Sequence, residues 1–215
     1  MPSNISSRTF LGERIKSPVF PPPSKIPLAK FRGLRLNLPS MESSAEYLII
    51  SGSLRSSSRS RMMAHFLTDC YRSTGIAAQM IDLRGVPLPF CDGEAAYDHQ
   101  SVLTLSKIIS EARVVIVATP IYNFDVSAAL KNMIELTGES WEDKVVGFLC
   151  AAGGSMSYMS VMSFANSLML DFRCLVIPRI VYATSEDFTD GRPSSAIVQE
   201  RIRELARASI RIRNG

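Results

Sequence analysis

Short apolar runs alternate with amphipathic segments throughout residues 46–215, and this alternation limits the fold more than any other feature of the sequence. The strand-like runs are residues 47–50, 77–82, 114–118, 145–151 and 175–181. The helix-like segments are residues 62–71, 100–112, 126–137 (closed by Gly138), 156–170 and 195–212. Strands that alternate with helices form right-handed βαβ units and a parallel sheet. We therefore predict an α/β fold, a three-layer α/β/α sandwich whose five-stranded parallel sheet has the order 2-1-3-4-5.

Residues 1–45 have a different composition, rich in Ser, Pro, Arg and Lys, and they show no hydrophobic period. We predict a disordered basic extension here, with the folded domain confined to residues 46–215. A basic, serine-rich segment nearly free of acids is typical of an organelle transit peptide. Translation from Met41 is the alternative. The first option predicts a plastid or another organelle as the location, and the second predicts the cytoplasm.

The distribution of charge argues against a nucleic-acid partner. Residues 1–40 hold seven of the 24 basic side chains and one of the 20 acidic ones, so the rest of the chain carries a net charge of −2. A near-neutral domain lacks the basic surface that phosphate backbones require. No apolar run is long enough to span a bilayer, which predicts no membrane partner. The four cysteines show no metal-ligand spacing, and we predict reduced thiols and no metal.

The segment after the first strand has the composition of a phosphate-binding loop. In a doubly wound sheet, ligands bind beyond the carboxyl ends of the strands. Residues 52–60 (GSLRSSSRS) lie between a strand and a helix N-terminus, whose free N–H groups favour phosphate. Ser53, Ser58 and Ser60 offer hydroxyl donors, and Arg55 can bind two phosphate oxygens. The loop matches neither the P-loop nor the GxGxxG pattern, which favours a single phosphate. A flexible serine-rich turn is the alternative.

The loops after the third and fourth strands are suited to a flat ligand. Residues 119–124 (TPIYNF) combine an aromatic wall with backbone groups for edge hydrogen bonds. The alternative is a helix lead-in in which Tyr122 packs on the next helix. Residues 151–156 (AAGGSM) contain two glycines that allow close approach to a ligand, although an ordinary strand-to-helix turn would also fit. Three such loops at one edge of the sheet carry more weight than any one of them.

Together these segments resemble the NADPH-dependent FMN reductase family, which has a flavodoxin-like fold. The resemblance covers about residues 46–185 and rests on GSLRSSSRS at 52–60, TPIYN at 119–123, LKN at 130–132 and the glycine pair at 153–154. It is nearest to the sulfonate-assimilation FMN reductases. The quinone, azo and chromate reductase branch usually has Glu where this chain has Ile121.

The resemblance implies roles for ten residues in binding FMN. The phosphate would be bound by Ser53, Arg55, Ser58 and Ser60. The isoalloxazine ring would contact Pro120, Ile121, Tyr122 and Asn123. Backbone contacts to the pyrimidine side of the ring would come from Gly153 and Gly154.

The activity implied by the resemblance is hydride transfer from NADPH or NADH to FMN, with electrons passing onward to a quinone or another small acceptor. The cofactors carry the hydride chemistry, so no catalytic acid or base is predicted. Family members commonly form homodimers or homotetramers, and we expect one of these states. The alternative function is a flavodoxin-like FMN-binding electron carrier, or a sensor, without NAD(P)H turnover. Electron carriers tend to be strongly acidic for docking, and this domain is not.

Overall fold

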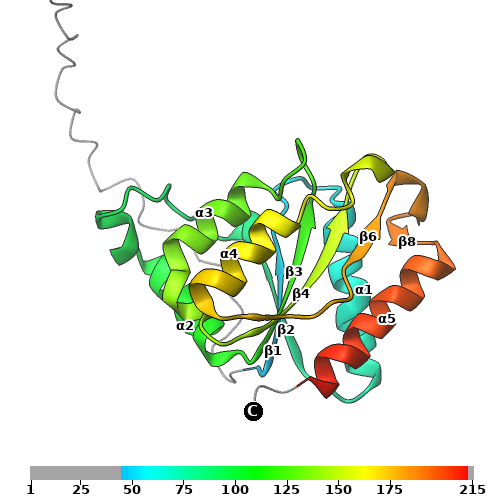
Figure 1. Cartoon of the computed structure of the whole chain (residues 1–215), viewed down its shortest axis with the longest axis horizontal. Helices are drawn as coiled ribbons and strands as arrows, with labels where there is room; N and C mark the ends of the chain where they lie inside the picture. Colours follow the sequence, from blue (N-terminus) through cyan, green and yellow to red (C-terminus); the bar gives the residue numbers. More distant parts are fainter. Residues whose placement is uncertain (1–44, 213–215) are drawn as a thin grey trace, which may run out of the picture. The chain divides into compact units, whose positions relative to one another are not determined.

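The computed structural model describes residues 45–212, which form a twisted parallel sheet covered by helices on both faces (Figure 1). The predicted disordered extension, residues 1–45, lies outside the described residues apart from Ala45. Among the described helices, none combines the length and the apolar character needed to cross a membrane.

The central sheet has the predicted strand order, β2-β1-β3-β4-β5, and its strands are parallel. Its strands are β1 (Tyr47–Ser51), β2 (Ala78–Asp82), β3 (Val114–Pro120), β4 (Val145–Ala151), β5 (Leu175–Val176) and β6 (Val181–Ala183). The pairing register places Ser51 beside both Asp82 and Ala118, so the carboxyl ends of β1, β2 and β3 lie at one edge. β3 and β4 extend further and end side by side at Pro120 and Ala151.

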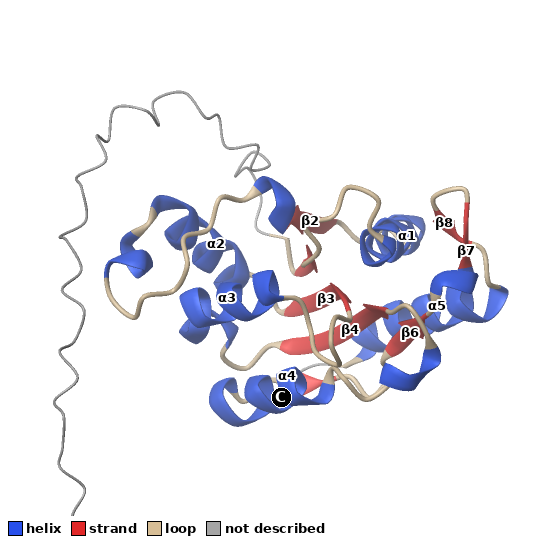
Figure 2. Ribbon diagram, turned by 90° about the horizontal axis from the view of Figure 1, so that it is seen from above, coloured by secondary structure: helices blue, strands red, loops and turns tan. Residues whose placement is uncertain are grey.

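The helices form the outer two layers of the predicted three-layer sandwich. α1 (Arg59–Ser73) and α5 (Ala196–Arg211) cover one face of the sheet. α2 (Gln100–Glu111), α3 (Ala128–Thr137) and α4 (Met162–Phe172) cover the other face (Figures 1 and 2). Short 3₁₀ helices connect these elements: η2 (Leu83–Gly85), η3 (Ala95–Asp98), η4 (Gly138–Trp141), η5 (Ser155–Ser157) and η6 (Ser185–Asp187).

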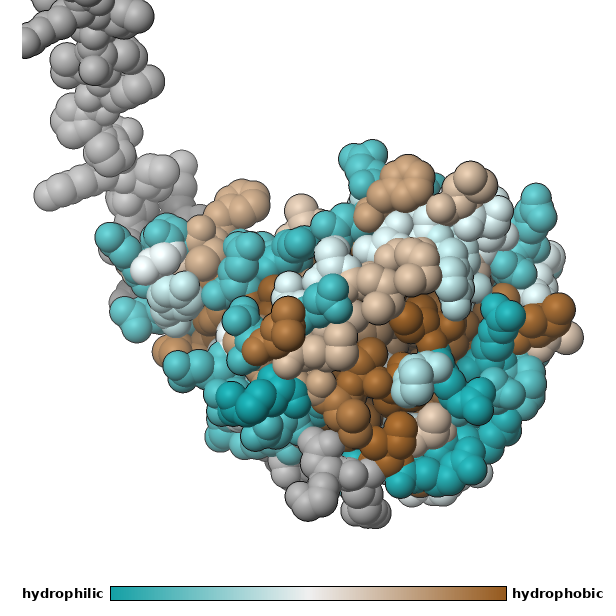
Figure 3. Space-filling view, in the orientation of Figure 1, coloured by the Kyte–Doolittle hydropathy of each residue, from teal (hydrophilic) through white to brown (hydrophobic). Residues whose placement is uncertain are grey.

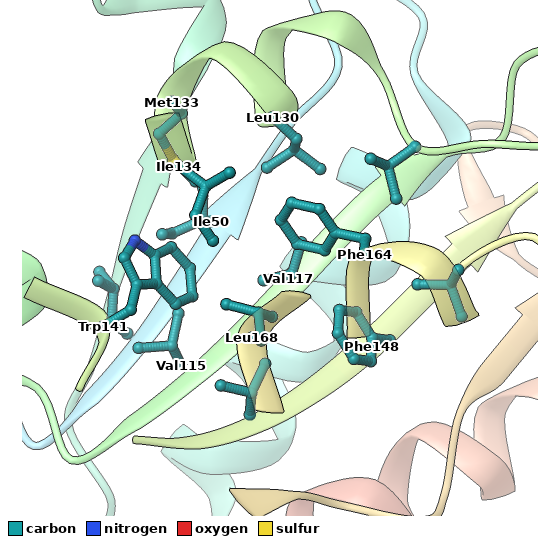
Figure 4. Close-up of a cluster of buried hydrophobic side chains, with 14 of the residues drawn as sticks. Ile50, Val115, Val117, Leu130, Met133, Ile134, Trp141, Phe148, Phe164 and Leu168 are labelled. Atoms are coloured by element: carbon teal, nitrogen blue, oxygen red, sulfur yellow. The ribbon is translucent and has the colours of Figure 1, made fainter. Parts of the chain in front are cut away.

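Every residue of β1, β3 and β4 is buried, which explains their continuous apolar sequences. Alternate side chains contribute to two cores, one on each face. On the α2–α4 face, Val115 and Val117 belong to one buried cluster with Leu130, Trp141 and Phe164 (Figure 4). Burying each such side chain stabilises the fold by roughly 1.5–3 kcal/mol. This packing fixes the sheet whose edge carries the predicted ligand loops.

The predicted strand 175–181 is wrong in its continuity, because it is divided into β5 and β6. Both pair with β4, but the register changes from Val146↔Val176 to Leu149↔Val181. Residues 177–180 therefore lie opposite two residues of β4. Pro178 lies in this interruption, and a proline has no N–H to donate to the ladder.

Two further boundaries differ from the sequence predictions. The predicted helix 156–170 begins at Met162, after η5, because Met156 and Met159 are exposed instead of packing against the core. The apolar side chains of Met156, Tyr158 and Met159 therefore lie at the surface, whereas Val161 is buried in the core. Gly138 follows α3 as expected, but its φ of −15° continues the chain into η4 instead of ending the helix in a left-handed turn.

A short antiparallel hairpin, β7 (Phe188–Thr189) with β8 (Arg192–Pro193), was not predicted. Its turn residues Asp190 and Gly191 have φ values of 48° and 75°. An Asp-Gly pair is favoured where both central residues of a tight hairpin turn have positive φ. The sequence therefore did contain a signal for this turn, but strands of two residues are too short to show an apolar period.

Candidate functional site

A cavity of about 820 Å³ lies at the carboxyl ends of β1, β3 and β4, where the three predicted loops meet the β7–β8 hairpin. This volume is in the range of small-molecule sites. The loops contribute nine of the ten predicted ligand residues to its lining: Ser53, Arg55, Ser58, Ser60, Pro120, Ile121, Tyr122, Asn123 and Gly153. Gly154 is the exception, because it lines a neighbouring hollow of about 300 Å³ together with Phe124 and Met156.

One end of the cavity has the character of an anion site. Ser58 caps α1, accepting a hydrogen bond from the Arg61 backbone N–H at 3.2 Å, and its Oγ lies 2.9 Å from Ser60 Oγ. Both serines are buried. Among the described residues, no backbone or side-chain acceptor takes the N–H groups of Arg59 and Ser60. Hydroxyls and free N–H groups at the start of a 15-residue helix favour a bound phosphate.

Arg61 holds this loop in place. Its guanidinium donates to the carbonyl oxygens of Ser53 and Arg55, both at 2.6 Å, and of Ser56 at 3.0 Å. The same group forms an ion pair with Asp82 at the end of β2, with Nε 2.7 Å from Oδ2. This role of Arg61 was not predicted from the sequence. The fold turns three carbonyls of this loop toward Arg61. Residue spacing in the sequence gives no sign of that arrangement.

Two other arginines beside the cavity remain available to a ligand. Arg55 is exposed and uses Nε to donate to Ser57 Oγ at 3.0 Å, and no partner of its terminal nitrogens is found among residues 45–212. Arg59 is exposed and lines the cavity, and in the same range it forms no ion pair. Charge-assisted hydrogen bonds from such groups strengthen the binding of a phosphate.

The second loop is a tight hairpin that presents aromatic side chains at the cavity. The backbones of Tyr122 and Asp125 bond to each other at 2.9 and 3.0 Å, and Asn123 and Phe124 between them have φ values of 50° and 62°. A bulky residue with positive φ is strained, and such strain concentrates at functional sites. Tyr122 lines the cavity and is 52% exposed, which favours the ligand-wall interpretation over packing on the next helix. Ile121 is buried beneath the turn.

The glycine loop is fastened from below by Tyr182 on β6. The Tyr182 hydroxyl donates to the Gly154 carbonyl and accepts from Ser157 Oγ at 2.7 Å. Ser185 Oγ bonds the Gly153 carbonyl at 3.4 Å. The backbone N–H groups of Gly153 and Gly154 have no acceptor among the described residues. A Cβ at either glycine would meet nothing within 4 Å, so the space above this backbone is open to a ligand.

Residues of α3 join the loops to one another. A Cβ on Gly52 would lie 2.3 Å from Leu130, so a glycine is required where β1 ends against this helix. Ser127 Oγ donates to the Gly52 carbonyl at 2.7 Å. Asn132 donates to the Pro89 carbonyl and accepts from the Cys91 N–H, both at 2.8 Å. The LKN motif therefore supports the site without lining the cavity.

The described residues fit FMN in chemistry and in shape. A phosphate matches the buried hydroxyls and free N–H groups at one end of the cavity. A flat ring matches the apolar wall of Pro120 and Ile121, and its polar edge matches the free N–H groups of the glycine loop. Within residues 45–212, no three His, Cys, Asp or Glu side chains are grouped to hold a metal ion.

The model of one protein family, described as NADPH-dependent FMN reductase, matches residues 46–189. The chain belongs to the NADPH-dependent FMN reductase family. This reductase is an NAD(P)H-dependent flavin oxidoreductase, with FMN and NAD(P)H as its cofactors.

Individual proteins agree with this family assignment. The NAD(P)H-dependent FAD/FMN reductase of Geobacillus thermodenitrificans is 29% identical to this chain over 164 residues. The match covers 73% of this chain and 87% of the Geobacillus protein. An NADPH azoreductase of a Bacillus species is 24% identical over 163 residues, covering 74% of this chain and 89% of the azoreductase. The solved apo structure of an NADH:FMN oxidoreductase superposes with a TM-score of 0.67 at 13% identity. The superposition covers 80% of this chain and 91% of the oxidoreductase. That structural likeness confirms the fold, whereas the roles of the individual residues stay predictions.

Proposed function

We propose that the reductase holds FMN in the cavity of about 820 Å³, with the phosphate in residues 53–60 and the ring between residues 120–123 and 152–154. The observation that carries this proposal is the pair of buried hydroxyls, Ser58 and Ser60, beside free N–H groups at the start of α1. A buried polar pair at the end of a large cavity fits one compact anion.

In this arrangement FMN, when bound, supplies the two-electron chemistry that links NAD(P)H to an acceptor. The protein binds FMN and orients it. Arg55 and the serines hold the phosphate, and Arg61 keeps their loop in the binding conformation. Tyr122 and Asn123 border one side of the ring, and the glycine backbone donates to its polar edge. No side chain is required to move a proton.

The electron acceptor that we propose is a small, flat organic molecule such as a quinone. It would enter where the glycine loop and the hairpin of residues 122–125 leave apolar side chains exposed. Tyr122, Phe124 and Tyr158 are 52%, 67% and 51% exposed. Exposed aromatic groups around an open cavity suit a planar ligand that arrives and leaves with each turnover. The finer position of the chain, near the sulfonate-assimilation reductases, stays a prediction.

We further propose that the reductase is a homodimer or a homotetramer. Apolar surface gathers between α4 and α5, over the β5–β6 segment (Figure 3). Leu170 at the end of α4 and Leu175 on β5 are both exposed there. Contiguous exposed apolar surface commonly marks a contact between proteins. Sedimentation velocity should give twice or four times the chain mass, and a mass of 23.7 kDa would contradict the proposal.

The proposed location is the cytoplasm, with a plastid or another organelle as the alternative if residues 1–45 act as a transit peptide. A fluorescent protein fused after residue 45 separates the two. Diffuse fluorescence supports the cytoplasm, and fluorescence concentrated in an organelle supports import. A matched fusion that begins at Met41 should remain diffuse in both cases.

The proposed site is tested by titrating the purified full chain with FMN and with riboflavin, followed by NADPH oxidation assays. FMN should bind at least tenfold more tightly than riboflavin, since charged hydrogen bonds contribute about 1.5–3 kcal/mol each. NADPH oxidation should depend on FMN. Equal affinities for the two flavins would contradict the phosphate site. FMN binding without oxidation of either nucleotide would favour the electron carrier or sensor.

A further inference from the structure

A second cavity, of about 540 Å³, lies between α1, β8 and α5, and we call it the α1–α5 groove. It meets the first cavity at the β7–β8 hairpin, because Met62 and Gly191 line both. Met62 belongs to the first turns of α1, near the serines that we assign to the FMN phosphate. The groove therefore continues the FMN cavity on the phosphate side.

The groove has a positive charge that nothing in the described chain neutralises. Arg192 on β8 is exposed, and no carboxylate pairs with it among residues 45–212. The acidic side chain in the lining, Asp69, is already bonded to Arg72 at 2.7 Å. Asp190 lies on the other side of the hairpin, in the first cavity. Unpaired arginine at a concave surface favours an anionic ligand, phosphate above all.

The floor of the groove is suited to a flat base. Met62 and Phe66 lie one turn apart on α1, so their side chains are neighbours. The Arg203 guanidinium stacks over the Phe66 ring at 5.3 Å and is held by Glu200 at 3.3 Å. Burial raises the pKa of the Cys70 thiol in the same groove, which keeps this group neutral. Aromatic and sulfur-containing surface beside a free arginine matches a nucleotide base with a phosphate nearby.

We propose that the α1–α5 groove binds the adenosine 2′-phosphate end of NADPH and that Arg192 binds the 2′-phosphate. The proposal rests on the proposed function, in which FMN occupies the first cavity and nicotinamide must reach its ring. The remainder of the dinucleotide then needs a binding surface outside that cavity, and the groove continues it directly. NADH has no 2′-phosphate, so the reductase prefers NADPH.

Arg61 is not available to bind the 2′-phosphate. Arg61 lies near the start of α1, but its guanidinium is committed to three loop carbonyls and to Asp82. It cannot bind a second anion without releasing the phosphate loop. Arg192, which lies on the hairpin shared by both cavities, has no such commitment.

The experiment measures the affinity of adenosine 2′,5′-bisphosphate and adenosine 5′-monophosphate for the FMN-loaded full chain by calorimetry. These ligands differ in the 2′-phosphate and cannot transfer a hydride. The bisphosphate should bind at least tenfold more tightly. Arg192→Gln should abolish this difference, while Arg201→Gln should retain it, because Arg201 is an exposed arginine of α5 outside both cavities. His65→Glu places a negative charge in the lining and should weaken binding of the bisphosphate more than the monophosphate.

Equal affinities of the two adenosine ligands for the unmodified chain would overturn the proposal, as would a tenfold difference that survives Arg192→Gln. Competition between the bisphosphate and FMN for the flavin-free chain would also overturn it, because the ligand would then occupy the phosphate loop. The FMN affinity of each variant is measured separately. Loss of FMN binding by the unmodified chain contradicts the proposed function, whereas retained FMN binding without a 2′-phosphate preference contradicts the groove alone.

Discussion

The two ends of the proposed FMN cavity are built in different ways. At the phosphate end, Ser53, Ser58 and Ser60 are buried, and Arg61 ties the loop to the end of β2. At the ring end, the glycine loop is exposed, and Met156 is 88% exposed. Its main attachment is the hydroxyl of Tyr182, which bonds both Gly154 and Ser157.

This contrast indicates a division of labour within one site. A phosphate is the same in every turnover, so a loop fixed before binding loses little entropy when the anion arrives. In the proposed function, the ring end admits nicotinamide and then an acceptor of a different shape. A loop with few buried contacts can adjust to both, and such segments have low local stability. Substitutions at Arg61, Arg55, Ser58 and Tyr182 test this division.

Arg61→Met should have the largest effect, because it removes the ion pair with Asp82 and leaves three loop carbonyls without their donor. The Arg61 side chain is 11% exposed and that of Asp82 is 34% exposed, so the pair is partly buried, and its loss together with three unpaired carbonyls should cost about 3 kcal/mol. Urea unfolding should register this loss, and FMN affinity should fall at least a hundredfold. Arg72→Met, on the same helix, breaks an exposed pair and should cost at most about 0.5 kcal/mol. Similar losses in both variants would contradict the role of Arg61 in holding the phosphate loop.

Arg55→Ala should weaken FMN binding by about 1.5–3 kcal/mol through loss of charged hydrogen bonds to the phosphate. Riboflavin lacks the phosphate, so its affinity should not change. Unfolding should also be nearly unaffected, since the Arg55 side chain is exposed and bonds only Ser57 among the described residues, while its backbone bonds remain in the variant. An unchanged FMN affinity in the folded variant would remove Arg55 from the site.

Ser58→Ala should cost about 1 kcal/mol of stability through loss of the α1 cap, and FMN affinity should fall about tenfold. Ser195→Ala supplies the matched control. Ser195 caps α5 with an equivalent bond to Val198 but lies outside both cavities. The two variants should be equally destabilised in thermal unfolding, and FMN affinity should fall in Ser58→Ala alone. Parallel changes in affinity would mean that Ser58 acts through helix stability.

Tyr182→Phe should have the smallest effect, since it removes one hydroxyl and costs about 0.5–1.5 kcal/mol. The glycine loop should loosen, which hydrogen exchange can detect in residues 153–157. FMN and riboflavin should lose affinity equally, about threefold to tenfold, because the loop contacts the ring and not the phosphate. A loss specific to FMN would break the proposed division between the two ends.

The sequence predicted the layered fold and the composition of the site because both depend on local patterns. Fully buried parallel strands give continuous apolar runs, and a serine-rich segment before α1 is readable as an anion loop. The errors have equally physical causes. Pro178 interrupts a strand that the apolar pattern predicts as continuous, and Met156 and Met159 contribute to an apolar pattern although both are exposed. Gly154, which was predicted to contact the flavin ring, lines the adjoining hollow, and its role in binding stays a prediction.

By itself, the sequence determined the order of strands and helices and the three loops at the carboxyl edge, since periodicity and turn chemistry act over a few residues. The different roles of the arginines beside the cavity depend on the tertiary structure. Arg55, Arg59 and Arg61 are alike in sequence, but the fold turns three carbonyls and Asp82 toward Arg61 alone. The fold also places Arg192 in the groove beside α1, a helix that lies more than a hundred residues before Arg192 in the chain. Such contacts depend on distances between segments remote in sequence, which local patterns do not encode.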